Sequence, residues 1–203
     1  VDLDDATHPE AVTVEHKTYL TTRVNGLEFS YLSGNFFQNN LYVLPLMVDP
    51  VLDHAATVSV RMNHSTDTRS SSSRIMTTHL VDCYCGSGLF AVSAAAAHYA
   101  EANLEQIVGI EINDKAVLEA TNNAIKNNVS AKCSFVAATA EGIFDQIQDF
   151  PRDTTCTILD PPRKGCSEEF LEQLYQFGPA KIVYMSCDPS TQARDAADMV
   201  AHG

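Results

Sequence analysis

A single cysteine, Cys187, stands where the apolar run at residues 182–185 gives way to a proline turn. A helix is expected to begin at Ser190 or Thr191, just after this turn. The N-terminus of a helix favours negative charge, so it stabilises a thiolate, the nucleophilic form of cysteine. A lone cysteine is more often a small core residue. The place of Cys187 at the end of an expected strand, with the positive charge of Arg194 nearby in sequence, makes it a candidate nucleophile.

The segment that begins at Asp160 joins a carboxylate to a stiff turn and two positive charges. Pro161 and Pro162 fix the backbone and remove two hydrogen-bond donors. Asp160 is therefore expected to be a preoriented polar group that faces a flat substrate, with Arg163 and Lys164 available for phosphate. The alternative is a rigid surface loop with solvated charges.

Two glycines, Gly86 and Gly88, follow an expected strand and precede an alanine-rich helix. Glycine lets the backbone approach a nucleotide closely, although a tight strand–helix turn also needs it. Ala91 occupies the third position of the dinucleotide fingerprint, which tolerates alanine, so a nicotinamide dinucleotide is still a possible cofactor. Asp82 weakly favours a ligand with a single adenosine group instead. Glu111 ends the next strand, where a carboxylate typically accepts hydrogen bonds from ribose hydroxyls, and this combination favours ligand binding.

Alternating strands and helices position these groups from Thr78 onward. Strands are expected at residues 79–84, 106–112, 132–138, 155–160 and 181–186. Helices are expected at residues 88–100, 113–128, near 140–149 and at 167–178. Asn113 and Ser167 are N-cap candidates, and Gly178 is a C-cap candidate. The order predicts an α/β, doubly wound fold with a mainly parallel sheet, helices on both faces and ligands beyond the carboxyl ends of the strands.

The chain is expected to divide into a flexible start, an N-terminal part and a ligand-binding core, at residues 1–15, 16–76 and 77–203. The start is polar and lacks periodicity. The N-terminal part is expected to contain a β-hairpin around Asn25-Gly26, which is the preferred type I′ turn pair. A helix is expected at residues 50–62, and a serine-rich loop at residues 63–74.

Composition narrows the class of protein. The chain has 203 residues and a formal charge of −13, so it is not a general nucleic-acid clamp, and a basic surface for RNA is expected to be local or outside this stretch. The six cysteines include no Cys-x-x-Cys pair, which argues against a structural zinc or an iron–sulfur cluster. No apolar run is long enough to span a membrane, and the acidic start is not a signal peptide. An intracellular protein with reduced thiols is expected.

Five segments occur along the chain in this order: FFQNN, DCYCGSGLF, GIEIN, DPPRKGC and YMSCDPSTQARD. Together they resemble the AdoMet-dependent RNA uracil-C5 methyltransferases, which form 5-methyluridine in tRNA and ribosomal RNA. The last two segments are the most specific, and the nearest likeness is to the fungal-type tRNA enzymes that act on the T-loop uridine. The resemblance implies a Rossmann-like class I methyltransferase fold, S-adenosylmethionine as cofactor and tRNA as substrate.

The resemblance also implies a role for single residues. Gln38 and Tyr84 would contact S-adenosylmethionine, Glu111 would hold its ribose, Asp160 would lie between cofactor and target base, and Cys187 would be the nucleophile. Contacts with RNA are assigned to three basic residues, Arg163, Lys164 and Arg194. The family has asparagine where this chain has Leu89 and Asp188.

The chemistry of the family explains these residue types. Addition of a thiolate at C6 of uracil makes C5 nucleophilic, C5 takes the methyl group, and a base then removes the C5 proton so that the cysteine can leave. The target uridine must be extruded from its stack. In the family the base is a glutamate well beyond the nucleophile. The base and the last two strands of the sheet are therefore expected after Gly203, in a C-terminally truncated catalytic domain.

Two other classes stay open. A nicotinamide-dependent enzyme on a Rossmann-like fold is compatible with the glycine loop, but hydride transfer does not require DPPRKGC or the segment around Cys187. A noncatalytic AdoMet-binding module would have the same loop without completing the reaction.

Overall fold

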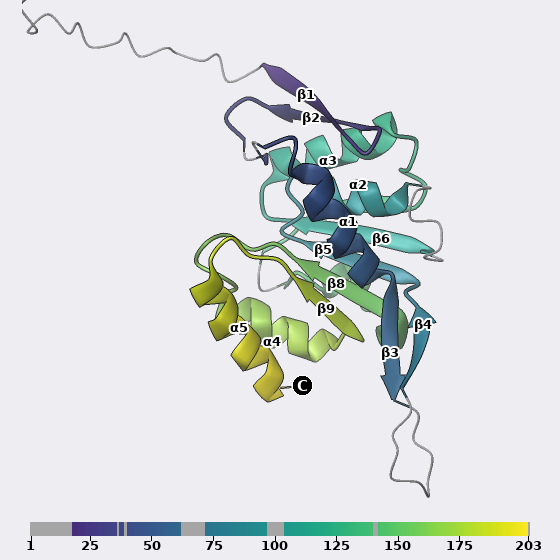
Figure 1. Ribbon diagram of the computed structural model, residues 1–203, viewed down its shortest axis with the longest axis vertical. Helices are drawn as coiled ribbons and strands as arrows, with labels where there is room; N and C mark the ends of the chain where they lie inside the picture. Colours follow the sequence, from purple (N-terminus) through teal and green to yellow (C-terminus); the bar gives the residue numbers. More distant parts are fainter. Residues whose placement is uncertain are drawn as a thin grey trace, which may run out of the picture.

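A parallel β-sheet of five strands forms the centre of the protein (Figure 1). The computed structural model describes residues 18–35, 37–38, 40–61, 72–96, 104–139 and 142–202. The strands are β5 (His79–Cys83), β6 (Gln106–Glu111), β7 (Cys133–Ala137), β8 (Thr155–Leu159) and β9 (Lys181–Tyr184), in the order β7-β6-β5-β8-β9. Since β5 lies in the middle, the carboxyl ends of β5, β6 and β8 meet at one edge. The predicted parallel α/β sheet is confirmed.

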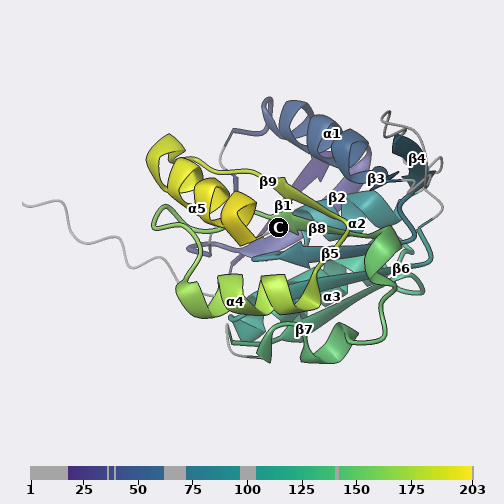
Figure 2. The same ribbon diagram turned by 90° about the horizontal axis from the view of Figure 1, so that it is seen from below.

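Helices cover both faces of this sheet (Figure 2). One face packs against α1 (Leu44–Ala55), α2 (Leu89–Ala95) and α3 (Asp114–Lys126), and the other packs against α4 (Glu168–Phe177), with α5 (Pro189–His202) beside α4. Successive residues of one strand therefore enter different cores: Leu80 points toward α1 and α2, and Val81 points toward α4. Burial on both faces explains why the strands are continuous apolar runs.

The predicted caps hold the helices that leave the sheet edge. The side chain of Asn113 accepts a hydrogen bond from the backbone N–H of Lys115 at 3.0 Å, and Ser167 accepts one from Phe170 at 3.3 Å. Gly178 ends α4 in the left-handed conformation, with φ of 62°. All three capping predictions are confirmed, because they depend on local chemistry alone.

The N-terminal hairpin is also confirmed. β1 (Tyr19–Val24) pairs with β2 (Leu27–Leu32), and Asn25 and Gly26 have φ of 50° and 82°, as a type I′ turn requires. The hairpin lies over α3, outside the sheet (Figure 1). Its apolar side, including Phe29, joins the same core as α1 and α2.

The helix predicted at residues 50–62 is confirmed at residues 50–55 and wrong beyond Ala55, and residue 62 lies outside the described residues. α1 begins earlier, at Leu44, with Pro45 in its first turn, where a missing N–H costs little, and Pro50 lies inside the helix. The chain then forms β3 (Thr57–Arg61), which pairs antiparallel with β4 (Ser72–Met76). Alternation of β-branched Thr57, Val58 and Val60 with serine favours this strand. The predicted serine-rich loop is wrong at residues 72–74, which belong to β4, and residues 63–71 lie outside the described residues.

The α-helix predicted near residues 140–149 is also wrong. Within the described part of this segment, residues 145–147 form a short 3₁₀ helix, η3 (Asp145–Ile147), and no residue is α-helical. The buried residues Phe144, Ile147 and Phe150 are spaced by three, which matches the three residues per turn of a 3₁₀ helix. The helix expected at residues 88–100 is confirmed as α2, which ends earlier, at Ala95, because Ala96 is extended. Residues 97–103 and the predicted flexible start at residues 1–15 lie outside the described residues.

Candidate active site

The predicted nucleophile lies on the turn between β9 and α5. Of the six cysteines, Cys187 is the exposed one and the other five are buried. The carboxylate of Asp188 accepts hydrogen bonds from the backbone N–H and the hydroxyl of Ser190, at 2.9 and 2.6 Å, so Asp188 caps α5. These hydrogen bonds with Ser190 hold the pKa of Asp188 below its ordinary value. The hydroxyl of Ser186 also joins the backbone of Asp188, at 3.1 Å for both contacts. The thiol of Cys187 is therefore presented on a turn fixed on both sides.

The predicted carboxylate, Asp160, follows β8, the strand next to β9. Its backbone N–H points to the carbonyl of Cys83 on β5, and the side chain is partly buried. Burial raises the pKa of this carboxyl group to about 6. Asp160 and Cys187 thus share one edge of the sheet, as predicted from the sequence, and the structure shows that their strands are neighbours.

The two loops that carry Asp160 and Cys187 are tied together by Asp195 of α5. Its carboxylate, 1% exposed, accepts hydrogen bonds from the backbone N–H of Cys166 at 2.8 Å and from the hydroxyl of Tyr184 at 2.7 Å. Arg194 donates to the second carboxylate oxygen through Nε and Nη2, at 2.8 and 2.6 Å. Burial alone would raise the pKa of Asp195, but the hydrogen bonds from Tyr184, Cys166 and Arg194 hold it below its ordinary value.

The three basic residues assigned to RNA have different surroundings. Arg163 and Lys164 are exposed on the loop after Asp160. Arg194 is also exposed over much of its side chain, but its guanidinium donates to Asp195 and to the carbonyl oxygens of Lys164 and Cys166. Cys187 is not among the partners of Arg194. The structure thus gives Arg194 a bracing role in the loop, which sequence reasoning did not identify.

The loop after β5 has an unusual backbone. Tyr84, Gly86 and Gly88 all have positive φ, of 62°, 52° and 85°. Positive φ is strained for a tyrosine and unstrained for glycine. At Gly88 an added Cβ would also approach Ala120 and Phe135 to 3.0 Å, so close packing of the loop on α3 and β7 needs glycine there. The tight-turn interpretation of the glycines therefore holds at Gly88, whereas at Gly86 an added Cβ would meet nothing within 4 Å and ligand binding stays a prediction.

Glu111, at the end of β6, faces this loop. Its two carboxylate oxygens accept hydrogen bonds from the backbone N–H groups of Gly86, at 3.1 Å, and Asn113, at 3.0 Å. Each oxygen keeps a further lone pair. Glu111 is therefore oriented by the backbone and still able to accept hydroxyl groups, as expected for a carboxylate that holds a ribose.

The other two predicted cofactor residues, Tyr84 and Gln38, are described by the residues that pack around them. The ring of Tyr84 packs against Phe170 of α4, with ring centroids 5.1 Å apart, so the side chain faces the core. Gln38 follows Phe37, which is buried and stacks on Tyr31 at 4.2 Å. Phe37 thus fixes the chain beside Gln38 on the hairpin side of the molecule.

Asp82 lies beneath the loop and is fully buried. One oxygen accepts a hydrogen bond from the backbone N–H of Ala91 at 2.9 Å, and the other has no hydrogen-bond partner among the described residues. Burial raises the pKa of Asp82 to about 8, with smaller contributions from the charges of Asp160 and Glu111. Asp82 therefore supports the start of α2 from within the core.

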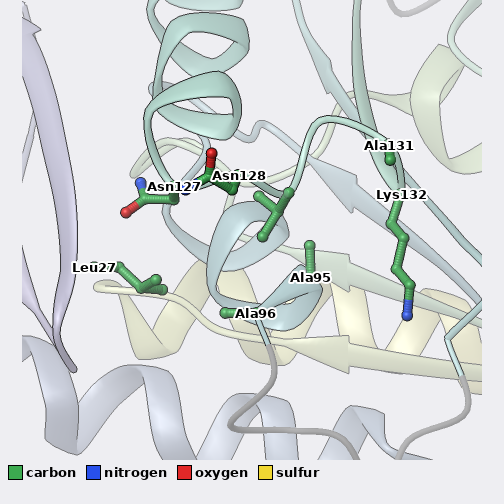
Figure 3. Close-up of a pocket in the computed structure, with 8 residues that line it drawn as sticks. Leu27, Ala95, Ala96, Asn127, Asn128, Ala131 and Lys132 are labelled. Atoms are coloured by element: carbon green, nitrogen blue, oxygen red, sulfur yellow. The ribbon is translucent and has the colours of Figure 1, made fainter.

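A pocket of about 400 Å³ lies elsewhere (Figure 3). It lies at the edge where β6 and β7 begin, and its lining residues are Leu27, Ala95, Ala96, Asn127, Asn128, Val129, Ala131 and Lys132. It contains none of the predicted site residues.

In the described parts of the chain, no three His, Cys, Asp or Glu side chains are grouped to hold a metal ion. No helix among those described is both long and apolar enough to cross a membrane.

Sequence reasoning missed three polar residues of this region. Asp188 was noted only as a departure from the family pattern, although an aspartate before Pro189 is an N-cap signal. Asp195 and Glu119 are buried acids whose partners lie far away in sequence, so no local pattern could reveal them.

The sheet order, the glycine loop after the central strand and the acid after the next strand define a Rossmann-like class I methyltransferase fold. The model of the tRNA (Uracil-5-)-methyltransferase family matches residues 53–202. The chain belongs to this family.

Individual relatives agree with that assignment. The chain is 38% identical to the tRNA (uracil(54)-C(5))-methyltransferase of Saccharomyces cerevisiae over 93% of its length, and 34% identical to that of Schizosaccharomyces pombe over 98%. It spans 26% and 34% of these two proteins. The crystal structure of the Pyrococcus abyssi tRNA (uracil-54, C5)-methyltransferase with S-adenosyl-L-homocysteine has the same fold. That comparison has a TM-score of 0.64 and 24% identity, covering 88% of this chain and 37% of that one.

Proposed function

We propose that this chain is part of an S-adenosylmethionine-dependent enzyme that methylates C5 of a uridine in tRNA, the T-loop uridine at position 54. The observation that carries the proposal is that an exposed thiol, Cys187, and a partly buried carboxylate, Asp160, follow adjacent parallel strands at one edge of the sheet. Membership of the family and the names of the yeast relatives support the choice of substrate.

The residues at this edge fit an adenosyl ligand. Glu111 is oriented by two backbone N–H groups and can accept the two hydroxyls of a ribose. The next residue, Ile112, is 70% exposed, so it offers an apolar surface against which a purine can pack. S-Adenosylmethionine, when bound, supplies the methyl group on its sulfonium. Gln38 and the backbone from Tyr84 to Gly88 are the other proposed contacts.

The chain's own residues have distinct parts in the proposed reaction. The thiolate of Cys187 adds to C6 of uracil, and the electron pair of the C5–C6 double bond moves into an enolate, so that C5 can accept the methyl group. Asp160, ionised above about pH 6, accepts a hydrogen bond from the ring N–H and orients the base. Loss of the C5 proton to a base then restores the double bond and releases the thiolate.

A fluorinated substrate tests the nucleophile. With fluorine in place of the C5 hydrogen there is no proton to remove, so the cysteine cannot be released. The full-length protein with S-adenosylmethionine and 5-fluorouridine-containing tRNA should therefore form a covalent complex that is visible on a denaturing gel. Cys187→Ser should form no complex, whereas Cys133→Ser, which changes a buried cysteine, should form it. A complex that persists in Cys187→Ser would show that another residue is the nucleophile.

Calorimetric titration separates the methyltransferase from the nicotinamide alternative. The full-length protein should bind S-adenosylhomocysteine, and Glu111→Gln should bind it more weakly because an amide presents one acceptor in place of two. Binding of NAD in its place would reject the proposed cofactor.

The exposed loop after Asp160 is proposed to contact phosphate. Arg163→Ala and Lys164→Ala should each weaken tRNA binding, and each should reduce the slope of log affinity against log salt by about 1. The side chains can be removed safely, because the loop is held through backbone atoms such as the carbonyl of Arg163, which accepts from Thr191 at 3.1 Å. Lys132→Ala is the control, since Lys132 is exposed at the opposite edge of the sheet.

A further inference from the structure

Polar side chains on α3 and at its C-cap form a second set of partners for strand β2. Three residues spaced by four lie along one side of the helix and face the hairpin: Glu119, Asn123 and Asn127. They bond alternate residues of β2, which are Glu28, Ser30 and Leu32. The side chains thus act in place of a neighbouring strand and satisfy the outer edge of the hairpin.

Asn123 and Asn127 make nearly identical contacts with β2. Asn127 accepts from the backbone N–H of Glu28 at 2.9 Å and donates to its carbonyl at 2.8 Å. Asn123 accepts from the N–H of Ser30 at 2.8 Å and donates to its carbonyl at 3.1 Å. Their third bonds differ. Asn127 donates to the backbone of its own helix, at Asn123, whereas Asn123 donates to the carbonyl of Ser87, at 2.9 Å.

Glu119 also connects the hairpin side of the molecule to Ser87. It is 2% exposed, and its Oε2 accepts from the hydroxyl of Ser87 at 2.8 Å. Its Oε1 accepts from the backbone N–H of Leu32 at 3.1 Å and from Nδ2 of Asn35 at 2.7 Å. One carboxylate therefore joins the end of β2, the segment that leads to Gln38, and the glycine loop.

Ser87 is the residue between Gly86 and Gly88. The loop around it has positive φ at three residues, so its backbone has many alternative conformations unless contacts select one. Glu119 and Asn123 bind the hydroxyl and the carbonyl of Ser87, respectively. These two contacts fix the position of Ser87 and of its carbonyl group, which belongs to the peptide before Gly88. On the other side of Ser87, the backbone N–H of Gly86 donates a hydrogen bond to Glu111.

We propose that Glu119 and Asn123 are positioning residues that fix the glycine loop for its adenosyl ligand and couple that loop to the β1–β2 hairpin. This inference rests on the proposed function, because it concerns the same ligand. It adds two residues, neither of which was predicted, and it gives the hairpin a part in ligand binding. Loss of either residue should free the loop, so that binding must order it again.

The matched pair Asn123→Ala and Asn127→Ala tests the proposal in the full-length protein. Both changes remove two bonds to β2, but only the first also removes the hydrogen bond to the carbonyl of Ser87. S-Adenosylhomocysteine affinity, measured by calorimetry well below each variant's melting temperature, should fall about tenfold in Asn123→Ala and change by less than about twofold in Asn127→Ala. Equal losses of affinity in the two variants would overturn the proposal, and so would wild-type affinity in Asn123→Ala.

Changes at Ser87 and Glu119 keep the test decisive if Asn123→Ala does not fold. Ser87→Ala removes one tie and leaves β2 untouched, and it should also weaken binding. Glu119→Gln can keep an oxygen toward Leu32 and Asn35 and donate its amide to the Ser87 hydroxyl, so it should bind better than Glu119→Ala. Wild-type affinity in both Ser87→Ala and Glu119→Ala would overturn the proposal. A wild-type protein that does not bind S-adenosylhomocysteine would instead reject the proposed function.

Discussion

The backbone N–H of Cys166 donates a hydrogen bond to the carboxylate of Asp195, 29 residues later, at 2.8 Å. Cys166 lies in the loop that begins at Asp160, and Asp195 lies on the helix that begins after Cys187. The same carboxylate oxygen accepts the hydroxyl of Tyr184 on β9. A single buried acid therefore sets the spacing between the proposed nucleophile and the proposed base-orienting carboxylate.

Replacing Asp195 should destabilise the protein more than replacing one of its partners. Asp195→Asn leaves the buried N–H of Cys166, the hydroxyl of Tyr184 and the guanidinium of Arg194 competing for one amide oxygen, and should lower the free energy of unfolding by about 2–4 kcal/mol. Tyr184→Phe removes one hydrogen bond and should cost about 1 kcal/mol. Urea denaturation measures both. Equal costs for the two variants would show that Asp195 is not the centre of the cluster.

Two glycines with the same backbone conformation should differ in their tolerance of alanine. Gly165 and Gly26 have φ of 80° and 82°, so Gly→Ala should cost about 1–2 kcal/mol of stability at either position. At Gly165 an added Cβ would also lie 2.5 Å from Nη2 of Arg194 and from Oδ2 of Asp195, whereas at Gly26 it meets nothing within 4 Å. Gly165→Ala should therefore cost about 1–3 kcal/mol more than Gly26→Ala in thermal or urea unfolding. A larger loss at Gly26 would contradict this packing.

The cysteines should react in two groups. Brief treatment of the native protein with iodoacetamide, followed by peptide mass spectrometry, should modify Cys187 and leave the five buried cysteines unmodified until denaturant is added. The reason is access, because alkylation requires contact between the reagent and the sulfur. Protection of Cys187 in the native protein, or early modification of Cys156, would contradict the structure.

Asp82 should make stability depend on pH. Its pKa is raised in the folded protein to about 8, so the stability that it contributes is fully present below its ordinary pKa of about 4 and is lost as pH rises toward 8. The loss approaches about 1.4 kcal/mol per pH unit within this window. Asp82→Asn resembles the protonated form, so it should match the wild type near pH 3 and exceed it increasingly in stability as the pH rises to 8. Urea denaturation at both pH values measures this, and a stability difference independent of pH would contradict it.

Local signals in the sequence were sufficient for much of the fold. The Asn25-Gly26 turn, the caps Asn113 and Ser167, and the alternation of apolar strands with helices all depend on neighbours a few residues apart. The positions of Glu111, Asp160 and Cys187 followed because residues after parallel strands share one edge of the sheet. Where the local signal was ambiguous, as at residues 57–61 and in the described part of 140–149, the helix predictions failed, since packing against the rest of the protein decided the conformation.

The sequence by itself determined the fold class, the family and the residues that could perform the chemistry. Only the tertiary structure decided which side chains hold those residues in place. Asp195 meets Cys166, and Glu119 meets Ser87, across separations of 29 and 32 residues. Such contacts form only when the sheet brings distant helices and loops together. A buried carboxylate is stable there because the folded backbone supplies its hydrogen-bond donors, and no pattern of neighbouring residues records that arrangement.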